Sequence, residues 1–370
     1  MNYSYWEYKQ WLSNIDFTIV GSGIVGLSAA YFLKEKFPNS KVLILEKGML
    51  PQGASTKNAG FACFGSASEV LSDLKSHTEE EVVTLVEQRF KGVNLLCSIV
   101  GKKQIDLQIN GGHELFLDTQ EELYQNSLEQ LAYINSLLKP VFKQSPFLET
   151  PNHFGFQNIA NNYISHKFEG QLDTGKLMHA LLKKVVSKGV ILLSNSKVNG
   201  FTQLQNKVEV TTTKFKFSTS KLFVTTNGFA SQLINENVVP ARAQVLITKP
   251  INNLKIKGTF HLDQGYYYFR NIDNRILLGG GRNLDFKTEE TTNFGHTELI
   301  QKELERLLAE VILPDIAVEI EHRWSGIMGV GAQKKPIIKQ LSNNVYCGVR
   351  MGGMGVAIGS TVGKNLAEMV

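Results

Sequence analysis

A glycine-rich turn near the N-terminus constrains the fold of this 370-residue chain more than any other feature. The apolar run Phe17–Val20 leads into the turn Gly21–Gly26, with the sequence GSGIVG, and apolar residues at helical spacing follow. A second apolar run, Val42–Leu45, ends in Glu46. Strand, turn, helix, strand and acid in this order predict a domain that binds an adenine dinucleotide.

Each residue of the turn has a role in that prediction. Gly21 permits the sharp bend, Gly23 lets the backbone approach a pyrophosphate, and Gly26 lets the helix lie close to the strand. The start of the helix, at Ile24 and Val25, offers free N–H groups and a partial positive charge to the phosphates.

The acid at the end of the second strand indicates which dinucleotide is bound. Glu46 can accept hydrogen bonds from both ribose hydroxyls, and its charge would repel a 2′-phosphate, which disfavours NADP. We assign the neighbouring Lys47 to the same site. The alternative, a turn that serves only packing, leaves Glu46 without an explanation.

The composition narrows the classes of function. Lys and Arg exceed Asp and Glu by 39 to 34 and are scattered, so nucleic-acid binding has little support. Three distant cysteines without a CxxC pair favour a reducing, cytoplasmic setting and disfavour structural zinc. No run approaches the roughly 18 apolar residues of a membrane span, and the N-terminus lacks the apolar core of a signal peptide.

The first residues of the chain are unusually aromatic. We favour a short arm that packs on its own protein, and contact with a membrane surface is the alternative. The residues concerned are Tyr3, Tyr5, Trp6, Tyr8 and Trp11.

A second glycine-rich turn changes the expected cofactor from NAD to FAD. Gly352–Gly355 lies between the predicted strand Asn344–Val349 and the predicted helix Val356–Met369. The helix dipole can face the negative charge that develops on a reduced flavin ring. NAD needs no second helix N-terminus of this kind. The loop Gly53–Gly60, rich in small polar residues, is suited to wrapping a large planar ligand.

The remaining segments predict further elements. Helices are expected at Glu79–Val100 and Glu121–Leu138, with a hairpin between them over Ile105–Leu117. A helix capped by Asp173 and several strands return the chain to the dinucleotide domain. From Val238 the pattern is rich in β-strands.

One strand face in this β-rich region has the chemistry of a carboxylate site. Tyr266, Tyr268 and Arg270 alternate on one face, and Arg282 follows the next strand. An exposed strand face of an ordinary sheet is an equally good interpretation.

Several short segments also occur in an order shared with one enzyme family. They are Gly21–Gly26 with Glu46, Gly53–Gly60, Leu172–Leu177 with Val198, Thr225–Gly228, Pro240–Gln244, Arg323–Gly326 and Gly352–Gly355. Together they resemble the FAD-dependent amine and amino-acid oxidases that include D-amino acid oxidase, glycine oxidase and sarcosine oxidase. The resemblance covers nearly the whole chain.

The resemblance implies a set of residues that bind FAD. It also implies that FAD is bound without a covalent link, since no cysteine convincingly matches the flavin-linking one of sarcosine oxidase. They are Gly21, Gly23, Ile24, Val25, Gly26, Glu46, Lys47, Ser55, Thr56, Asn58, Ala59, Gly60, Val198, Thr226, Asn227, Gly228, Arg350, Gly352, Gly353, Met354 and Gly355.

The substrate side departs from the family pattern. Glycine oxidase-like members have an arginine for the substrate carboxylate where this chain has Met328. Either another arginine replaces it or the substrate lacks a carboxylate. The candidate replacements are Arg282, Arg270, Arg242 and Arg350, and the residues expected around the reacting atoms are Tyr268, Arg282, Trp324 and Met328.

The expected fold is α/β, with a discontinuous Rossmann-like domain and an inserted α+β substrate domain on a mixed, largely antiparallel sheet. The cofactor domain is predicted over residues 1–88, 167–236 and 321–370, and the substrate domain over 89–166 and 237–320.

The expected activity is oxidation of a C–N bond in a small amine or amino acid, by hydride transfer to flavin N5 and hydrolysis of the imine. Oxygen or a quinone would reoxidise the flavin, and a basic residue nearby would help oxygen; the candidates are Lys249, Lys334 and Lys335. The histidines are expected to be structural, with His322 the one to test. The alternatives are the flavin module of an enzyme that modifies tRNA at an aminomethyl uridine, and a flavoprotein without turnover.

Overall fold

The glycine-rich turn joins a buried strand to a buried helix in the computed structural model, which describes residues 3–370. Strand β1 (Ile15–Val20) pairs in parallel with β2 (Val42–Leu45) on one side and with β11 (Lys216–Val224) on the other. Helix α2 (Ile24–Lys36) begins directly after the turn. The predicted strand, turn, helix and strand are therefore confirmed.

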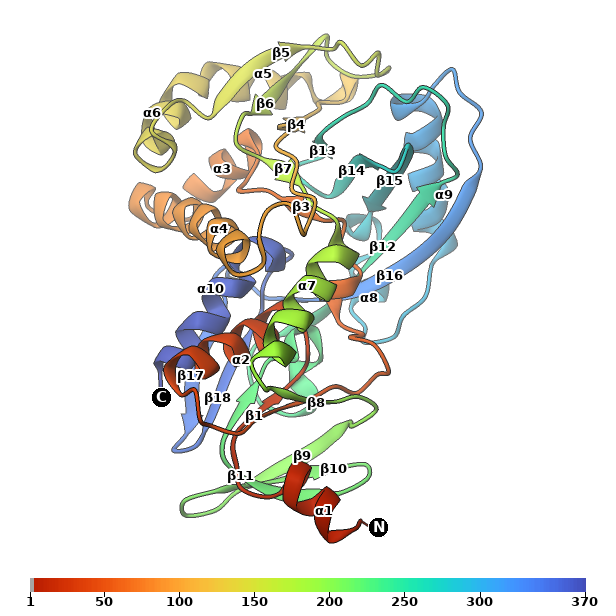
Figure 1. The fold of residues 1–370 in the computed structure, drawn as a ribbon. Helices are drawn as coiled ribbons and strands as arrows, with labels where there is room; N and C mark the ends of the chain where they lie inside the picture. Colours follow the sequence, from red (N-terminus) through yellow and green to blue (C-terminus); the bar gives the residue numbers. More distant parts are fainter. Residues whose placement is uncertain (1–2) are drawn as a thin grey trace.

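Around these strands lies the first of two large sheets, in the lower half of Figure 1. Its strand order is β17-β18-β11-β1-β2-β8, and β9 and β10 extend it beside β11. The additional strands are β8 (Ile191–Leu193), β9 (Val198–Gln203), β10 (Val208–Thr212), β17 (Ile337–Ser342) and β18 (Val345–Val349).

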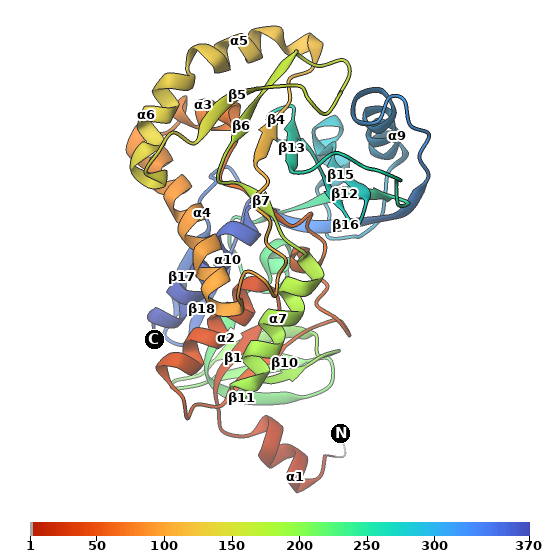
Figure 2. The same ribbon diagram turned by 45° about the horizontal axis from the view of Figure 1, so that its top comes forward.

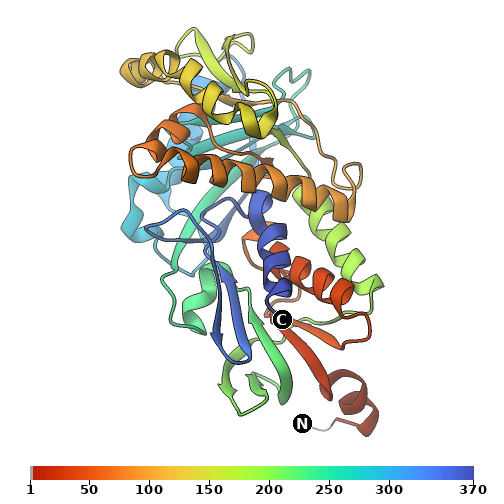
Figure 3. The ribbon, with the colours of Figure 1, turned by 90° about the vertical axis from the view of Figure 1, so that its left-hand side faces the viewer.

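A layer of helices covers one face of the first sheet. Helix α10 (Gly355–Glu368) packs on α2, which also contacts α7 (Thr174–Ser187). Helix α4 (Glu79–Val100) lies across α10 and α7 (Figure 3). The side chain of Asp173 caps α7 by accepting a hydrogen bond from the N–H of Lys176, as the sequence predicts.

The second sheet, in the upper half of Figure 1, is mostly antiparallel. Its order is β16-β12-β15-β14-β13-β4-β6-β5, and only β4 and β13 are parallel. Its strands are β4 (Gly112–Glu114), β5 (Phe147–Pro151), β6 (Asn162–His166), β12 (Val239–Thr248), β13 (Thr259–Leu262), β14 (Tyr267–Ile272), β15 (Arg275–Gly280) and β16 (Ile320–Val330). This is the mixed, largely antiparallel sheet expected from the sequence.

Shorter elements complete the fold. Helix α3 (Ala67–Leu74) follows the two-stranded pair of β3 (Phe61–Ala62) with β7 (Gly170–Gln171). Helices α8 (Phe286–Glu289) and α9 (Glu298–Leu307) follow β15.

Two predicted elements are wrong. The segment Ile105–Leu117 forms no hairpin, because β4 pairs with β13 and β6 instead, and Gln108 bridges to Gln171. The predicted helix Glu121–Leu138 is two helices, α5 (Glu121–Glu129) and α6 (Leu131–Phe142). For β4, contacts with distant strands outweigh the local pattern.

The domain boundaries remain a proposal, and the strand pairing suggests one adjustment. The boundary predicted between residues 320 and 321 falls at the start of β16, which pairs along its length with β12. We propose that the last cofactor segment begins after Val330. The boundary between residues 88 and 89 lies inside α4, which contacts α10 and also α6.

The aromatic arm does not bury its aromatic side chains. Residues Tyr5–Glu7 form α1, and Figure 2 shows this helix at the end of the molecule farthest from the second sheet. Trp6 is 71% exposed, while Leu12 is buried. The predicted packing of the arm on its own protein is therefore confirmed only in part: the ring of Tyr3 lies 6.3 Å from that of Phe215, while the aromatic side chains remain exposed. Within residues 3–370, none of the helices has the length and apolar character needed to cross a membrane.

Candidate active site

A cavity of about 570 Å³ begins at the carboxyl ends of β1 and β2 and reaches the second sheet. The residues that line it come from the glycine-rich turn, the loop before β3, the end of β11, strands β12 and β14 to β16, and the turn before α10. The end of parallel strands is the usual ligand position in open α/β sheets.

The first turn is shaped for close contact between backbone atoms. Gly21 has a φ of +104°, which disfavours a side chain. A Cβ on Gly26 would lie 2.1 Å from the carbonyl oxygen of Gly21, so helix and strand could not be this close. A Cβ on Gly23 would lie 2.8 Å from Ser55 Oγ, which accepts a hydrogen bond from the N–H of Ile24.

Glu46 lies in the wall of the cavity and is buried. Its carboxylate accepts hydrogen bonds from the N–H and hydroxyl of Ser22, at 3.2 and 2.7 Å, and from the N–H of Gly48 at 3.1 Å. These bonds hold the acid beside the turn, where a ribose would lie. Lys47 also lines the cavity; its ammonium is 3.4 Å from the ring centre of Phe229, and burial lowers its pKa.

Asn58 gives the loop between β2 and β3 its shape. Its amide nitrogen donates to the carbonyls of Ala54 and Ser55, and its amide oxygen accepts from the N–H of Gly60. The hydroxyl of Thr174 on α7 donates to the same oxygen at 3.0 Å. The loop is thereby tied to α7 while its inner face lines the cavity.

The end of β11 and the turn before α10 form another part of the wall. The hydroxyl of Thr226 is buried and has no hydrogen-bond partner within residues 3–370. Asn227 Oδ1 accepts a hydrogen bond from the N–H of Met351, which joins the two segments. Gly352 and Gly353 have φ of +57° and +83°, and α10 then begins at the cavity.

These features fit an adenine dinucleotide with a flavin. The turns leave room for a pyrophosphate, two helix N-termini face the cavity, and an unsatisfied hydroxyl lies in its wall. The predicted cofactor residues that line it are Gly21, Gly23, Ile24, Val25, Glu46, Lys47, Ser55, Asn58, Ala59, Val198, Thr226, Asn227, Gly352, Gly353, Met354 and Gly355.

Five predicted cofactor residues lie behind this lining. Gly26 and Gly60 permit close packing of backbone segments, and Gly228 lies against the backbone of Met328. Thr56 donates its hydroxyl proton to the carbonyl of Pro51. The last, Arg350, donates to the carbonyls of Lys335 and Asn237, so it braces the C-terminal turn from outside.

Of the four candidate arginines, only Arg282 lines the cavity. Arg242 is neutralised by Glu289, at 2.8 and 2.7 Å. Arg270 is buried behind Gly60, and Arg350 braces its turn. The guanidinium of Arg282 has no hydrogen-bond or ion-pair partner among residues 3–370, and burial lowers its pKa.

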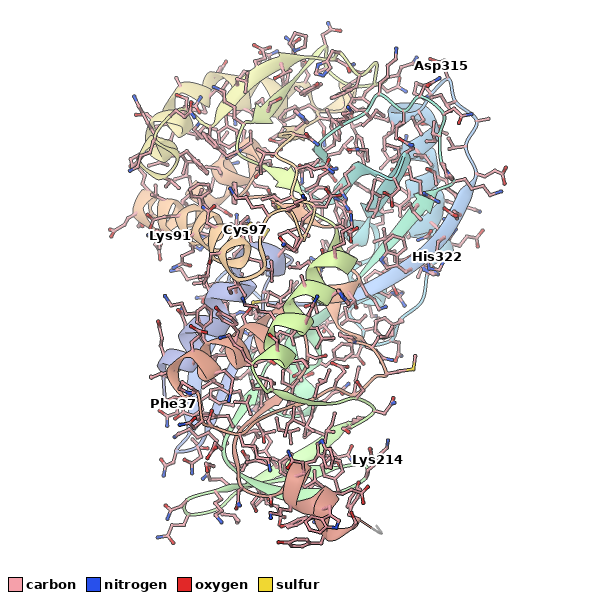
Figure 4. All side chains as sticks on the ribbon, in the orientation of Figure 1. Phe37, Lys91, Cys97, Lys214, Asp315 and His322 are labelled. Atoms are coloured by element: carbon pink, nitrogen blue, oxygen red, sulfur yellow. The ribbon has the colours of Figure 1, made fainter. Side chains whose placement is uncertain are left out.

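Tyr268 and Met328 both line the cavity, but Trp324 does not. Burial raises the pKa of Tyr268 to about 12, so its hydroxyl remains protonated. Trp324 donates its indole N–H to the carbonyl of Lys57 at 2.9 Å, so it positions the loop from behind. His322 stacks on Trp324 and lies on the edge strand β16 (Figure 4).

Among the candidate lysines, Lys334 alone lines the cavity, and it pairs with Asp73 at 2.5 Å. Lys249 and Lys335 pair with exposed acids elsewhere.

A model of the FAD-dependent oxidoreductase family named DAO matches residues 16–369. The chain belongs to this family. It is therefore an FAD-dependent oxidoreductase, as its two glycine-rich turns indicated.

Curated relatives agree over nearly the whole chain. A probable oxidoreductase OrdL of Haemophilus influenzae is 22% identical over 97% of this chain and 83% of its own length. The sarcosine oxidase subunit beta of Rhodobacter capsulatus is 23% identical over 100% of this chain and 88% of its own length.

Solved structures share the fold of this oxidoreductase. L-proline dehydrogenase of P. horikoshii matches with a TM-score of 0.76 and 17% identity, over 96% of this chain and 93% of its own. Glycine oxidase of Geobacillus kaustophilus matches with a TM-score of 0.75 and 18% identity, over 96% and 94%. The predicted fold class is thus confirmed.

Sequence reasoning missed several residues of this oxidoreductase's cavity. His261 was expected to be structural, yet it lines the wall formed by β13. Glu69 and Ser72 line it from α3, and Gln264 from the turn after β13. One signal was available for Glu69: Ser66 and Glu69 form a capping box, which marks the start of α3 directly after the loop.

Proposed function

We propose that this oxidoreductase oxidises the C–N bond of a small amino acid whose carboxylate pairs with Arg282. The observation that carries the proposal is the unpaired guanidinium of Arg282 in the cavity wall. A half-buried charge without a partner is costly, and a planar carboxylate is the ligand that a guanidinium pairs with best. The names of the glycine and sarcosine oxidase relatives support the same class of substrate.

The surrounding residues would orient such a substrate. Tyr268 offers a protonated hydroxyl as a hydrogen-bond donor. Its ring packs edge-on against Phe61 and lies over Gly279, where a Cβ would be 2.7 Å from it. Met328 adds an apolar surface next to Gly353. When bound, FAD supplies at N5 the acceptor for the hydride of the substrate's Cα–H, and water hydrolyses the imine that is released.

The cofactor residues have a separate task. The turns at Gly21–Gly26 and Gly352–Gly355 would hold the cofactor from both ends, so that the substrate meets it in a fixed geometry. Tight backbone packing makes these segments stiff, which lowers the cost of ordering them on binding.

Anaerobic mixing tests the proposal. Purified holoenzyme is mixed with a panel of amino acids and with the amines that correspond to them without a carboxylate. We expect the flavin absorption band to bleach with one or more amino acids and less readily with the matching amines. An absence of bleaching across the panel would overturn the proposed function. Readmission of oxygen or addition of a quinone then identifies the electron acceptor.

A further inference from the structure

One part of the cavity wall carries an acid that the proposed chemistry does not use. Glu69, on α3, accepts a hydrogen bond from the N–H of Ser66 through Oε2 at 3.0 Å. Its other oxygen, Oε1, has no hydrogen-bond or ion-pair partner among the residues described. This oxygen faces Gly265, where a Cβ would lie 3.0 Å from it. The cavity therefore contains one unpaired carboxylate oxygen.

A second polar group lies in the same wall without a partner. His261, on β13, is 7% exposed, and its Nε2 atom is buried with no hydrogen bond within residues 3–370. Its ring stands edge-on to Phe61, which fixes its position. Burial lowers the pKa of His261, so the ring is neutral and adds no positive charge beside Glu69. Buried polar atoms of this kind are normally satisfied.

Glu69 makes no salt bridge with any cation among residues 3–370. Lys334, which also lines the cavity, pairs with Asp73 at 2.5 Å. Arg89, the buried cation of the neighbouring helix α4, donates to the carbonyl of Phe64. A partly buried carboxylate with an open oxygen favours a cation from outside the protein.

We propose that Glu69 and His261 bind a second, cationic group of the substrate, so that the preferred substrates are amino acids with a remote amine or guanidine. This inference rests on the proposed function, since Arg282 would hold the carboxylate. Glu69 would accept hydrogen bonds from the remote cation through Oε1, and the neutral ring of His261, with its proton on Nδ1, would accept one more through Nε2.

Pairing with the remote group suits the chemistry better than pairing with the reacting amine. The reacting amine must be neutral to lose a hydride from the adjacent carbon. A carboxylate held against it would favour its protonated form and oppose the reaction. A cation that does not react carries no such conflict.

Binding of ω-amino acids to the holoenzyme tests the inference without turnover. The series 3-aminopropanoate to 6-aminohexanoate is compared with the fatty acids of the same length, propanoate to hexanoate. Dissociation constants come from calorimetry or from the shift of the flavin band. We expect at least one ω-amino acid to bind about tenfold more tightly than its matched fatty acid.

Two variants locate the effect. Glu69→Gln keeps an acceptor for Ser66 and the length of the side chain, and it should reduce the preference to within about twofold. Glu81→Gln is the matched control, because Glu81 has the same capping-box position on α4 but lies outside the cavity. It should keep the preference of the unchanged protein. Both variants should bind FAD normally.

The binding measurements can overturn the inference in two ways. The inference is overturned if no ω-amino acid exceeds its matched fatty acid, or if the preference survives in Glu69→Gln. If neither series binds, the inference and the role of Arg282 fall together. If the preference is present but no amino acid bleaches the flavin, the cation site stands and the proposed oxidation fails.

Discussion

Replacement of Arg282 by methionine removes the charge that we assign to the substrate carboxylate. The side chain makes no hydrogen bond within residues 3–370, and its guanidinium lies 4.7 Å from the ring centre of Phe286. Methionine keeps the length and the apolar stem. The variant therefore loses little besides the charge.

The structure predicts a small effect on stability. The cation–π contact contributes about 0.5–1 kcal/mol where it is partly exposed. Burial lowers the pKa of Arg282, because it disfavours the charged form in the folded protein. Removing the charge therefore offsets part of the lost cation–π energy. The net change should stay within about 1 kcal/mol, and the melting temperature should change by less than about 4 °C.

The effect on substrate binding should be larger. A hydrogen bond to a charged group contributes about 1.5–3 kcal/mol. At about 1.36 kcal/mol for each factor of ten, kcat/KM for an amino acid should fall roughly 13- to 160-fold. The value for the corresponding amine without a carboxylate should change by less than about threefold, because that amine offers nothing for Arg282 to bind.

Steady-state kinetics on the amino acid and the amine measure the two ratios. Arg275→Met is the matched control, because Arg275 pairs with Glu321 at the surface, outside the cavity. Its kinetics should equal those of the unchanged protein. Equal losses for the amino acid and the amine, or no loss for either, would refute the assignment of Arg282.

Three further predictions concern the fold and the cofactor. Gly26→Ala places a Cβ 2.1 Å from the Gly21 carbonyl and should destabilise the protein by about 1–3 kcal/mol in thermal unfolding, whereas Gly53→Ala, with free space around it, should not. Burial raises the pKa of Glu169 to about 7, so this carboxyl group keeps its proton to higher pH in the folded protein than in the unfolded chain. The free energy of unfolding should therefore fall as the pH rises from about 4.5 to 7. In denaturant titrations, Glu169→Gln should reduce that fall by up to about 3 kcal/mol. Acid precipitation should leave a yellow supernatant if FAD is held without a covalent link, as we predict, and a yellow pellet would contradict this.

The first cofactor-binding segment could be predicted because the residues that define it are close together in the sequence. Gly21, Gly23 and Glu46 lie within one strand–helix–strand unit, so their spacing in sequence fixes their positions in space. Glu69 and His261 come from a helix and a strand far apart in the chain, and nothing in the sequence brings them together. The hairpin predicted over Ile105–Leu117 failed for the same reason, since β4 takes its partners from distant strands.

The positions of Arg282 and Met328 allow a second test of the proposed carboxylate site. Met328 on β16 and Arg282 after β15 both line the cavity, and both strands pair with β12. On β12, Ala241 is the partner of Met328, while Gln244 is the partner of Gly280 at the end of β15. An arginine at position 328 on β16 would thus line the same cavity as Arg282, two strands away. If Arg282 is the carboxylate partner, Arg282→Met combined with Met328→Arg should restore part of the lost kcat/KM for amino acids and none for amines. A double variant as inactive as Arg282→Met would show that the two positions cannot serve one carboxylate.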